Sequence, residues 1–115
     1  MKLNIRKETN YLMIKIIGRL DISNTAQFKS EVSESIEDAK IIILELSELE
    51  FMDSTGLGAI ISILKIISKN DGNIFVVNLQ EKPRILFEIT RANRIFDIFN
   101  SLEDAVNAVE NYQEE

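Results

Sequence analysis

The sequence predicts an α/β protein in which helices cover a mixed, mostly parallel sheet of about four or five strands. An opening pair of segments with alternating apolar and polar residues predicts a β-hairpin. Two later apolar runs rich in β-branched residues predict buried strands. Four segments with helical spacing of apolar residues lie between or after the strands. Because a helix that connects two strands usually places them in parallel, these elements combine into a mixed sheet.

The strands are predicted over residues 2–6, 11–17, 40–46 and 74–78. A polar turn, Glu8-Thr9-Asn10, separates the first two and closes the hairpin. The third is an almost unbroken apolar run, typical of a central strand that is covered on both faces. The fourth follows the turn signal Asp71-Gly72.

The helices are predicted over residues 24–38, 55–69 and 82–90, with a fourth at the C-terminal end. Ser23 and Asn24 are alternative N-caps for the first helix. Pro83 is compatible with the first turn of the third helix. Ser101 and Asp104 have the spacing of a capping box, which predicts the start of the fourth helix.

The composition indicates one domain over residues 1–115 and excludes several classes of function. A net charge of −6 disfavours nucleic acid and anionic membranes as partners. The absence of cysteine and histidine removes the usual nucleophile and general base, and no apolar run approaches the length of a membrane span. We therefore expect a cytoplasmic protein without cofactor, metal or membrane insertion.

The most informative stretch is residues 49–58, which joins the central strand to the second helix. In a parallel α/β unit such a junction lies at the carboxyl end of the sheet, so Ser54 is expected to be exposed there. Gly56 and Gly58 each lower helix propensity, which suggests that the absence of a side chain at these two positions has a role. The alternatives are that Asp53 or Ser54 is only an N-cap, or that this is a phosphate-binding loop, although it lacks the lysine of a Walker motif.

The second helix carries two apolar stripes, which cannot both pack on the sheet. The first consists of Leu57, Ile60, Ile61, Leu64 and Ile67, and the second of Ala59, Ile63 and Ile66. Either the second stripe packs against the third helix, or part of it, including Ile63, forms a docking surface for a partner protein beside Ser54.

Residues 51–58, Phe-Met-Asp-Ser-Thr-Gly-Leu-Gly, resemble the signature of the STAS domain family and specifically of the bacterial anti-sigma factor antagonists. Residues 18–21, Gly-Arg-Leu-Asp, with Ala26 in the following helix, are similar to a second family motif. Residues 41–46 resemble its central strand, and residues 84–87 resemble the start of its third helix. The resemblance covers most of the chain and implies the STAS sandwich fold.

The resemblance implies that Ser54 is phosphorylated, with Thr55 as a secondary candidate. It further implies that the unphosphorylated protein binds an anti-sigma factor, itself a serine kinase, and thereby releases a sigma factor. A protein phosphatase then resets the phosphorylated form, and the chain catalyses nothing itself. The expected partner-binding residues are those at the carboxyl edge and on the second helix: Asp21, Asp53, Ser54, Thr55, Gly56, Leu57, Gly58 and Ile63.

Physical chemistry supports the same switch, because a phosphate adds about −1.5 to −2 charges beside Asp53. That charge opposes docking onto an acidic or apolar surface, whereas the helix N-terminus tolerates it. Asp21 and Asp53 could in principle hold Mg²⁺, but two carboxylates are weak evidence and no metal site is predicted.

Two other functions stay open on the sequence alone. Ser54 could be an enzyme nucleophile with Lys65 or Lys69 as base, although Lys65 lies about three helical turns away. A STAS domain could also be a scaffold or an accessory subunit of a signalling or transport complex without a sigma factor. The chain departs from the family after the third helix, where a glycine and a large apolar residue are common and Arg91-Ala92 stands here.

Overall fold

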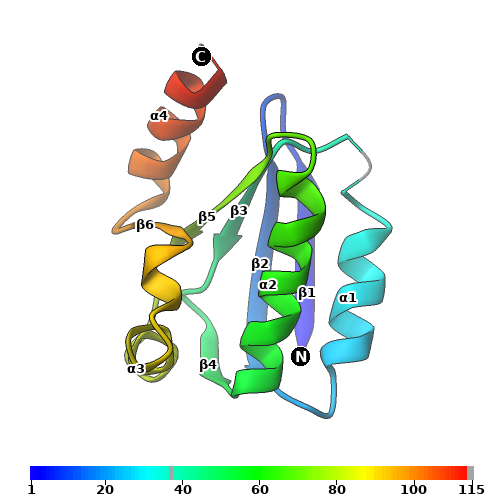
Figure 1. Ribbon diagram of the computed structural model, residues 1–115, viewed down its shortest axis with the longest axis vertical. Coiled ribbons are helices and arrows are strands. Elements are labelled where there is room, and N and C mark those ends of the chain that lie inside the picture. The colour runs from blue at the N-terminus through cyan, green and yellow to red at the C-terminus, as the bar shows by residue number, and fades with distance from the viewer. Residues whose placement is uncertain (37, 114–115) are drawn as a thin grey trace.

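The computed structural model describes residues 1–36 and 38–113 and folds them into six strands and four α-helices (Figure 1). The strands are β1 (Lys2–Lys7), β2 (Leu12–Leu20), β3 (Ile41–Glu45), β4 (Leu49–Met52), β5 (Asn73–Val77) and β6 (Asp97–Phe99). The α-helices are α1 (Thr25–Ser33), α2 (Ser54–Ser68), α3 (Glu81–Ile89) and α4 (Leu102–Gln113), and a 3₁₀ helix η1 spans Ala92–Arg94. Residue 37, within the helix predicted over residues 24–38, and residues 114–115 of the predicted domain lie outside the described residues.

The strands form one mixed sheet in the order β1-β2-β3-β5-β6, with β4 paired to β2. Only β1 and β2 are antiparallel, and the pairs β2–β3, β2–β4, β3–β5 and β5–β6 are parallel. The predicted fold class is therefore confirmed. The sheet has six strands rather than four or five because β4 and β6 contain only four and three residues, too few for a clear periodic pattern.

Strand β2 pairs with two different strands along its length. Its first part lies beside β3, whereas its last three residues lie beside β4. The register shifts between Gly18 and Arg19, and Gly18 has a positive φ of 96°, a conformation that glycine adopts readily. As a result β4 ends beside the end of β2, and the amide of Asp53 donates to the carbonyl of Leu20 at 3.3 Å.

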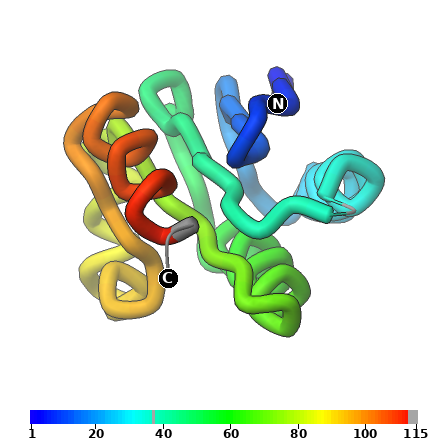
Figure 2. Tube along the Cα trace, turned by 90° about the horizontal axis from the view of Figure 1, so that it is seen from above, coloured from blue at the N-terminus to red at the C-terminus, as the bar shows by residue number. Residues whose placement is uncertain are grey.

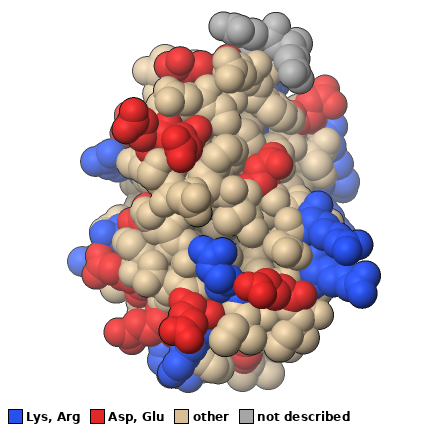
Figure 3. Space-filling view, turned by 90° about the vertical axis from the view of Figure 1, so that its left-hand side faces the viewer, with Lys and Arg blue, Asp and Glu red and all other residues tan. Residues whose placement is uncertain are grey.

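Alternating side chains of the strands divide the core between the two faces of the sheet. Leu12, Ile14 and Ile16 of β2 pack with buried residues of α1, α2 and α3. Met13 packs on the opposite face, where Ala105 and Val109 of α4 are buried. Figure 2 shows α1 and α2 lying close together along the strands. On the side of the molecule that carries α4, the upper part shows mainly acidic side chains, and basic and acidic side chains lie together in the lower part (Figure 3).

Helix α2 buries most of both apolar stripes, and α1 lies along it on the same face of the sheet. Ile60, Ile67, Ala59 and Ile63 are all buried, and Ile63 is only 2% exposed. The second stripe is therefore mainly core, and α1 rather than the predicted α3 is the helical neighbour. Ile66 alone of that stripe is exposed.

The end of α3 retains a left-handed residue although glycine is absent. Arg91 has φ 62° and ψ 21°, and its amide donates to the carbonyl of Glu88 at 3.2 Å. Ala92 follows and is buried. The arginine occupies a conformation that costs a residue with a Cβ atom roughly 1 kcal/mol relative to glycine.

Candidate functional site

The candidate site lies at the carboxyl ends of β2 and β4, at the lower end of the molecule in Figure 1. The loop after β2 leads into α1, and β4 leads through Asp53 directly into α2. The N-termini of both helices therefore meet at this edge. Because a helix N-terminus carries unpaired N–H groups and partial positive charge, the edge suits anionic groups.

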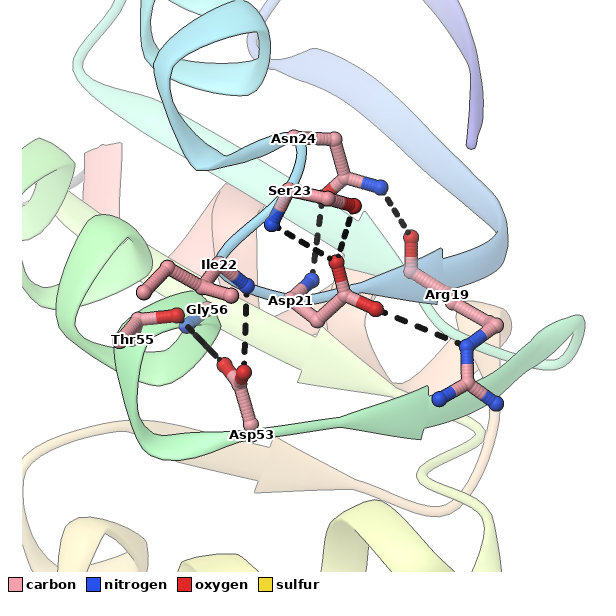
Figure 4. Close-up of polar contacts among 8 residues, drawn as sticks. All are labelled: Arg19, Asp21, Ile22, Ser23, Asn24, Asp53, Thr55 and Gly56. Carbon is pink, nitrogen blue, oxygen red and sulfur yellow. Dashed lines mark hydrogen bonds and ion pairs between the residues drawn. The ribbon is translucent and has the colours of Figure 1, made fainter.

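The carboxylate of Asp53 connects the two segments (Figure 4). As the N-cap of α2, it accepts a hydrogen bond from the amide of Gly56 at 2.9 Å and one from the hydroxyl of Thr55 at 2.6 Å. Its other oxygen accepts the amide of Ile22, in the loop after β2, at 3.1 Å. One side chain thus caps the helix and fixes the neighbouring loop.

The carboxylate of Asp21 organises that loop from within. It accepts the amide and the hydroxyl of Ser23 and forms an ion pair with Arg19, whose Nε lies 3.6 Å away. Asn24 completes the turn, since its side chain accepts the amide of Asp21 and donates to the carbonyl of Arg19, each at 3.0 Å. Asn24 is the N-cap of α1 by position, but its side chain closes the loop instead of capping the helix.

Both carboxyl groups ionise more readily than usual. The hydrogen bond from the Thr55 hydroxyl is the largest cause that lowers the pKa of Asp53, and the amides of Gly56 and Ile22 add to it against partial desolvation. The hydroxyl and the amide of Ser23 lower the pKa of Asp21. Both side chains are therefore negatively charged at neutral pH, with much of their hydrogen-bonding capacity already used by the protein itself.

Ser54 and Thr55 are both exposed but differ in their bonding. Thr55 donates its hydroxyl proton to Asp53, whereas the Ser54 hydroxyl has no hydrogen-bond partner in the described part of the chain. Ser54 is the first residue of α2, and Asp53, not Ser54, is the N-cap. Of the two N-cap alternatives, the structure selects Asp53 and leaves the serine hydroxyl accessible.

The two glycines of the segment have different roles. A Cβ atom on Gly56 would lie 2.3 Å from the carbonyl oxygen of Leu20, so glycine lets α2 pack against the end of β2. A Cβ atom on Gly58 would have no neighbour within 4 Å. Gly58 lies four residues after Ser54 and so on the same face of the helix. The fold gives no reason for glycine at this exposed position.

The structure separates the predicted partner-binding residues into two groups. Asp21 and Asp53 are partly exposed, and Ser54, Thr55 and Gly58 are exposed, all at the edge described above or on the first turns of α2. Gly56, Leu57 and Ile63 are buried, so their atoms pack inside the protein and offer little surface to a partner.

Sequence reasoning missed Ile22, which is 75% exposed and bonded through its amide to Asp53. The only signal in the sequence is a large apolar residue within the polar run Asp21-Ile22-Ser23-Asn24.

No cluster of three or more potential metal ligands occurs within residues 1–36 and 38–113. Over the same residues, no helix combines the length and apolar character needed to cross a membrane.

Comparison with known proteins shows which family the chain resembles in sequence and fold. The family model of the STAS domain matches residues 2–105. The anti-sigma-B factor antagonist of Bacillus subtilis is 26% identical over 106 residues, covering 92% of this chain and 97% of that protein. The anti-sigma-B factor antagonist of Staphylococcus aureus strain NCTC 8325 is 30% identical over 93 residues, covering 78% and 86%.

Solved structures of a more distant protein show the same fold. The unphosphorylated form of the anti-sigma factor antagonist SpoIIAA has a TM-score of 0.75 and 21% identity, covering 95% of this chain and 98% of that one. The phosphorylated form, from Bacillus, has a TM-score of 0.74 and 22% identity, covering 94% and 99%. The fold described above therefore matches both forms about equally.

Proposed function

Because the chain belongs to the STAS domain family, we propose that it is an anti-sigma factor antagonist whose partner binding is switched by phosphorylation of Ser54. It acts as one domain in the cytoplasm. In its unphosphorylated form it binds an anti-sigma factor, a serine kinase, and so releases a sigma factor. The kinase phosphorylates Ser54 and dissociates, and a protein phosphatase removes the phosphate.

The observation that carries this proposal is the exposed and unbonded hydroxyl of Ser54 at the start of α2. A kinase can reach this oxygen without breaking a bond within the protein. Phosphorylation of Thr55 instead would remove the hydrogen bond to Asp53 that contributes to the helix cap. This difference favours Ser54 over its neighbour as the modified residue.

Charge explains why phosphorylation would end binding without unfolding the protein. A phosphate adds about −1.5 to −2 charges beside Asp53, whose lowered pKa keeps it ionised. A partner surface that fits the edge around unmodified Ser54 would then have to remove water from the charged phosphate, which costs free energy and weakens binding. The N-terminus of α2 stabilises the same phosphate locally, which offsets its cost to the fold.

The geometry argues against Ser54 as an enzyme nucleophile with a lysine base. Lys65, the nearer of the two lysines considered as a base, is eleven residues along α2 from Ser54, about 16 Å at the rise of an α-helix. A base at this distance cannot accept the serine proton. This distance supports the role of Ser54 as a substrate of the partner kinase over that of a nucleophile activated by Lys65.

The test is to express the protein in its native host and to map phosphate on the intact chain. We expect one phosphate at Ser54, its loss in Ser54→Ala, and its retention in Thr55→Val, the matched hydroxyl control. The unmodified protein should retain an anti-sigma factor kinase that Ser54→Asp releases. A phosphate-free chain whose partner is a transport or signalling complex and ignores Ser54→Asp would instead support the scaffold function.

A further inference from the structure

Ile22 is 75% exposed, and among the large apolar side chains of the described residues only Ile89, which is 74% exposed and lies at the end of α3, is comparable. It lies between β2 and α1, where a polar residue would cost the fold nothing, because little of its side chain is buried. An apolar side chain in water at this point gains nothing for stability. It gains free energy only if another surface covers it.

The backbone that presents Ile22 is fixed rather than loose (Figure 4). The amide of Ile22 donates a hydrogen bond to the Asp53 carboxylate, and the amide and hydroxyl of the next residue, Ser23, donate hydrogen bonds to the Asp21 carboxylate. Asn24 bonds the amide of Asp21 and the carbonyl of Arg19. Because little conformational entropy remains to be lost, an apolar side chain on such a loop is an efficient binding contact.

We propose that Ile22 is the apolar anchor of the partner interface and inserts into an apolar socket on the anti-sigma factor kinase that acts on Ser54. This inference rests on the proposed function and adds the residue that supplies affinity. The position supports this occupant, since the carboxylate that holds the Ile22 amide also caps the helix that begins with Ser54. A kinase that reaches Ser54 therefore approaches the same edge that presents Ile22.

The charges around Ile22 support an apolar contact over a cationic one. Asp21 and Asp53 flank it, but donors of the protein already bond their oxygens. They do not require cations from the partner. A phosphate on Ser54 would add about −1.5 to −2 charges beside the socket, and the hydration of its outward oxygens opposes closure of the apolar contact. Phosphorylation of Ser54 would thus weaken the contact at Ile22 and release the kinase without a change of fold.

One other exposed isoleucine and one conservative variant serve to test the assignment. Ile66 lies on α2 twelve residues after Ser54, about 18 Å away along the helix, and is 45% exposed. It therefore provides a matched control, the same residue type on the surface but remote from Ser54. Ile22→Leu provides rescue, because it keeps the apolar volume.

The experiment measures the dissociation constant of each variant for the purified kinase by calorimetry without ATP, so that Ser54 stays unmodified. We expect Ile22→Ala to bind at least ten-fold more weakly, Ile22→Leu to stay within about three-fold of wild type, and Ile66→Ala to bind as wild type. Thermal unfolding should show all variants folded, since both side chains are exposed.

The outcomes distinguish the two proposals. If the kinase binds wild type and Ile22→Ala equally well, the anchor is refuted while the proposed function stands. If Ile66→Ala weakens binding as much as Ile22→Ala, the effect is not specific to the edge and the anchor is also refuted. If no kinase binds the wild-type protein and Ser54 carries no phosphate in the native host, the proposed function fails, and the anchor with it.

Discussion

Replacement of Gly58 by alanine should stabilise the protein while impairing its function. Gly58 is exposed in the second turn of α2, and a Cβ atom there has open space within 4 Å. Alanine is favoured over glycine by about 1 kcal/mol in a helix interior. With no collision to oppose this gain, we expect the free energy of unfolding to rise by about 1 kcal/mol, or the Tm by about 4 °C for a domain of this size.

The same methyl group should weaken partner binding, because it occupies the face of α2 directly beside Ser54. A cost of about 1.4 kcal/mol, within the usual range for an added methyl group in a packed contact, corresponds to a ten-fold larger Kd for the kinase. Urea or thermal denaturation measures the first effect, and calorimetric titration with the kinase measures the second.

Gly56→Ala is the contrasting variant, since its Cβ atom would lie 2.3 Å from the Leu20 carbonyl oxygen. We expect it to lose about 2 kcal/mol of stability or more. If Gly58→Ala fails to stabilise the protein, the space around the Cβ position of residue 58 is not open. If it stabilises the protein and binds the kinase normally, the interface does not reach the second turn of α2.

Three further predictions concern the energetics of the site and its surroundings. Thr55→Val should lower the free energy of unfolding by about 1 kcal/mol by removing the hydrogen bond to Asp53, whereas Thr55→Ser, which keeps the hydroxyl, should lower it less in the same urea titration. Arg91→Gly should raise stability by about 1 kcal/mol because of the left-handed backbone, and Arg91→Ala, with its Cβ atom retained, should not. The pKa of Asp53 in the folded protein lies below its ordinary value of 3.8, so the ionised side chain stabilises the fold fully above the unfolded pKa, and this stabilisation is lost as the pH falls through the folded pKa. Between about pH 5 and pH 2 the free energy of unfolding of the wild type should therefore fall more than that of Asp53→Asn. Parallel curves of unfolding free energy against pH would contradict this role.

Most of the fold could be predicted because it depends on local patterns. The apolar run of residues 40–46 and the alternation in residues 11–17 gave strands at nearly the observed positions. The two short strands could not be found in this way. Residues 49–52 became β4 only because the end of β2 offers its edge, which depends on the register shift at Gly18.

The site was predictable in its chemistry but only partly in its arrangement. The motif around Ser54 indicated an exposed serine at a helix start, and the structure has it there. The bond between Asp53 and Ile22 joins residues 31 positions apart, and no local pattern encodes it. The burial of Ile63 depends likewise on how α2 packs in the core with the strands and the other helices, which the sequence of α2 alone does not specify.

The two-part pairing of β2 has a consequence for the order of folding. The β1–β2 hairpin involves neighbouring segments, whereas the pairing of β2 with β4 closes a loop that contains α1 and β3. Loop closure of this length costs entropy before its contacts form. We therefore expect the hairpin to form early and the edge that carries Ser54 to be completed late. A chain leaving the ribosome would then offer its serine to the kinase only after the β2–β4 contact has formed.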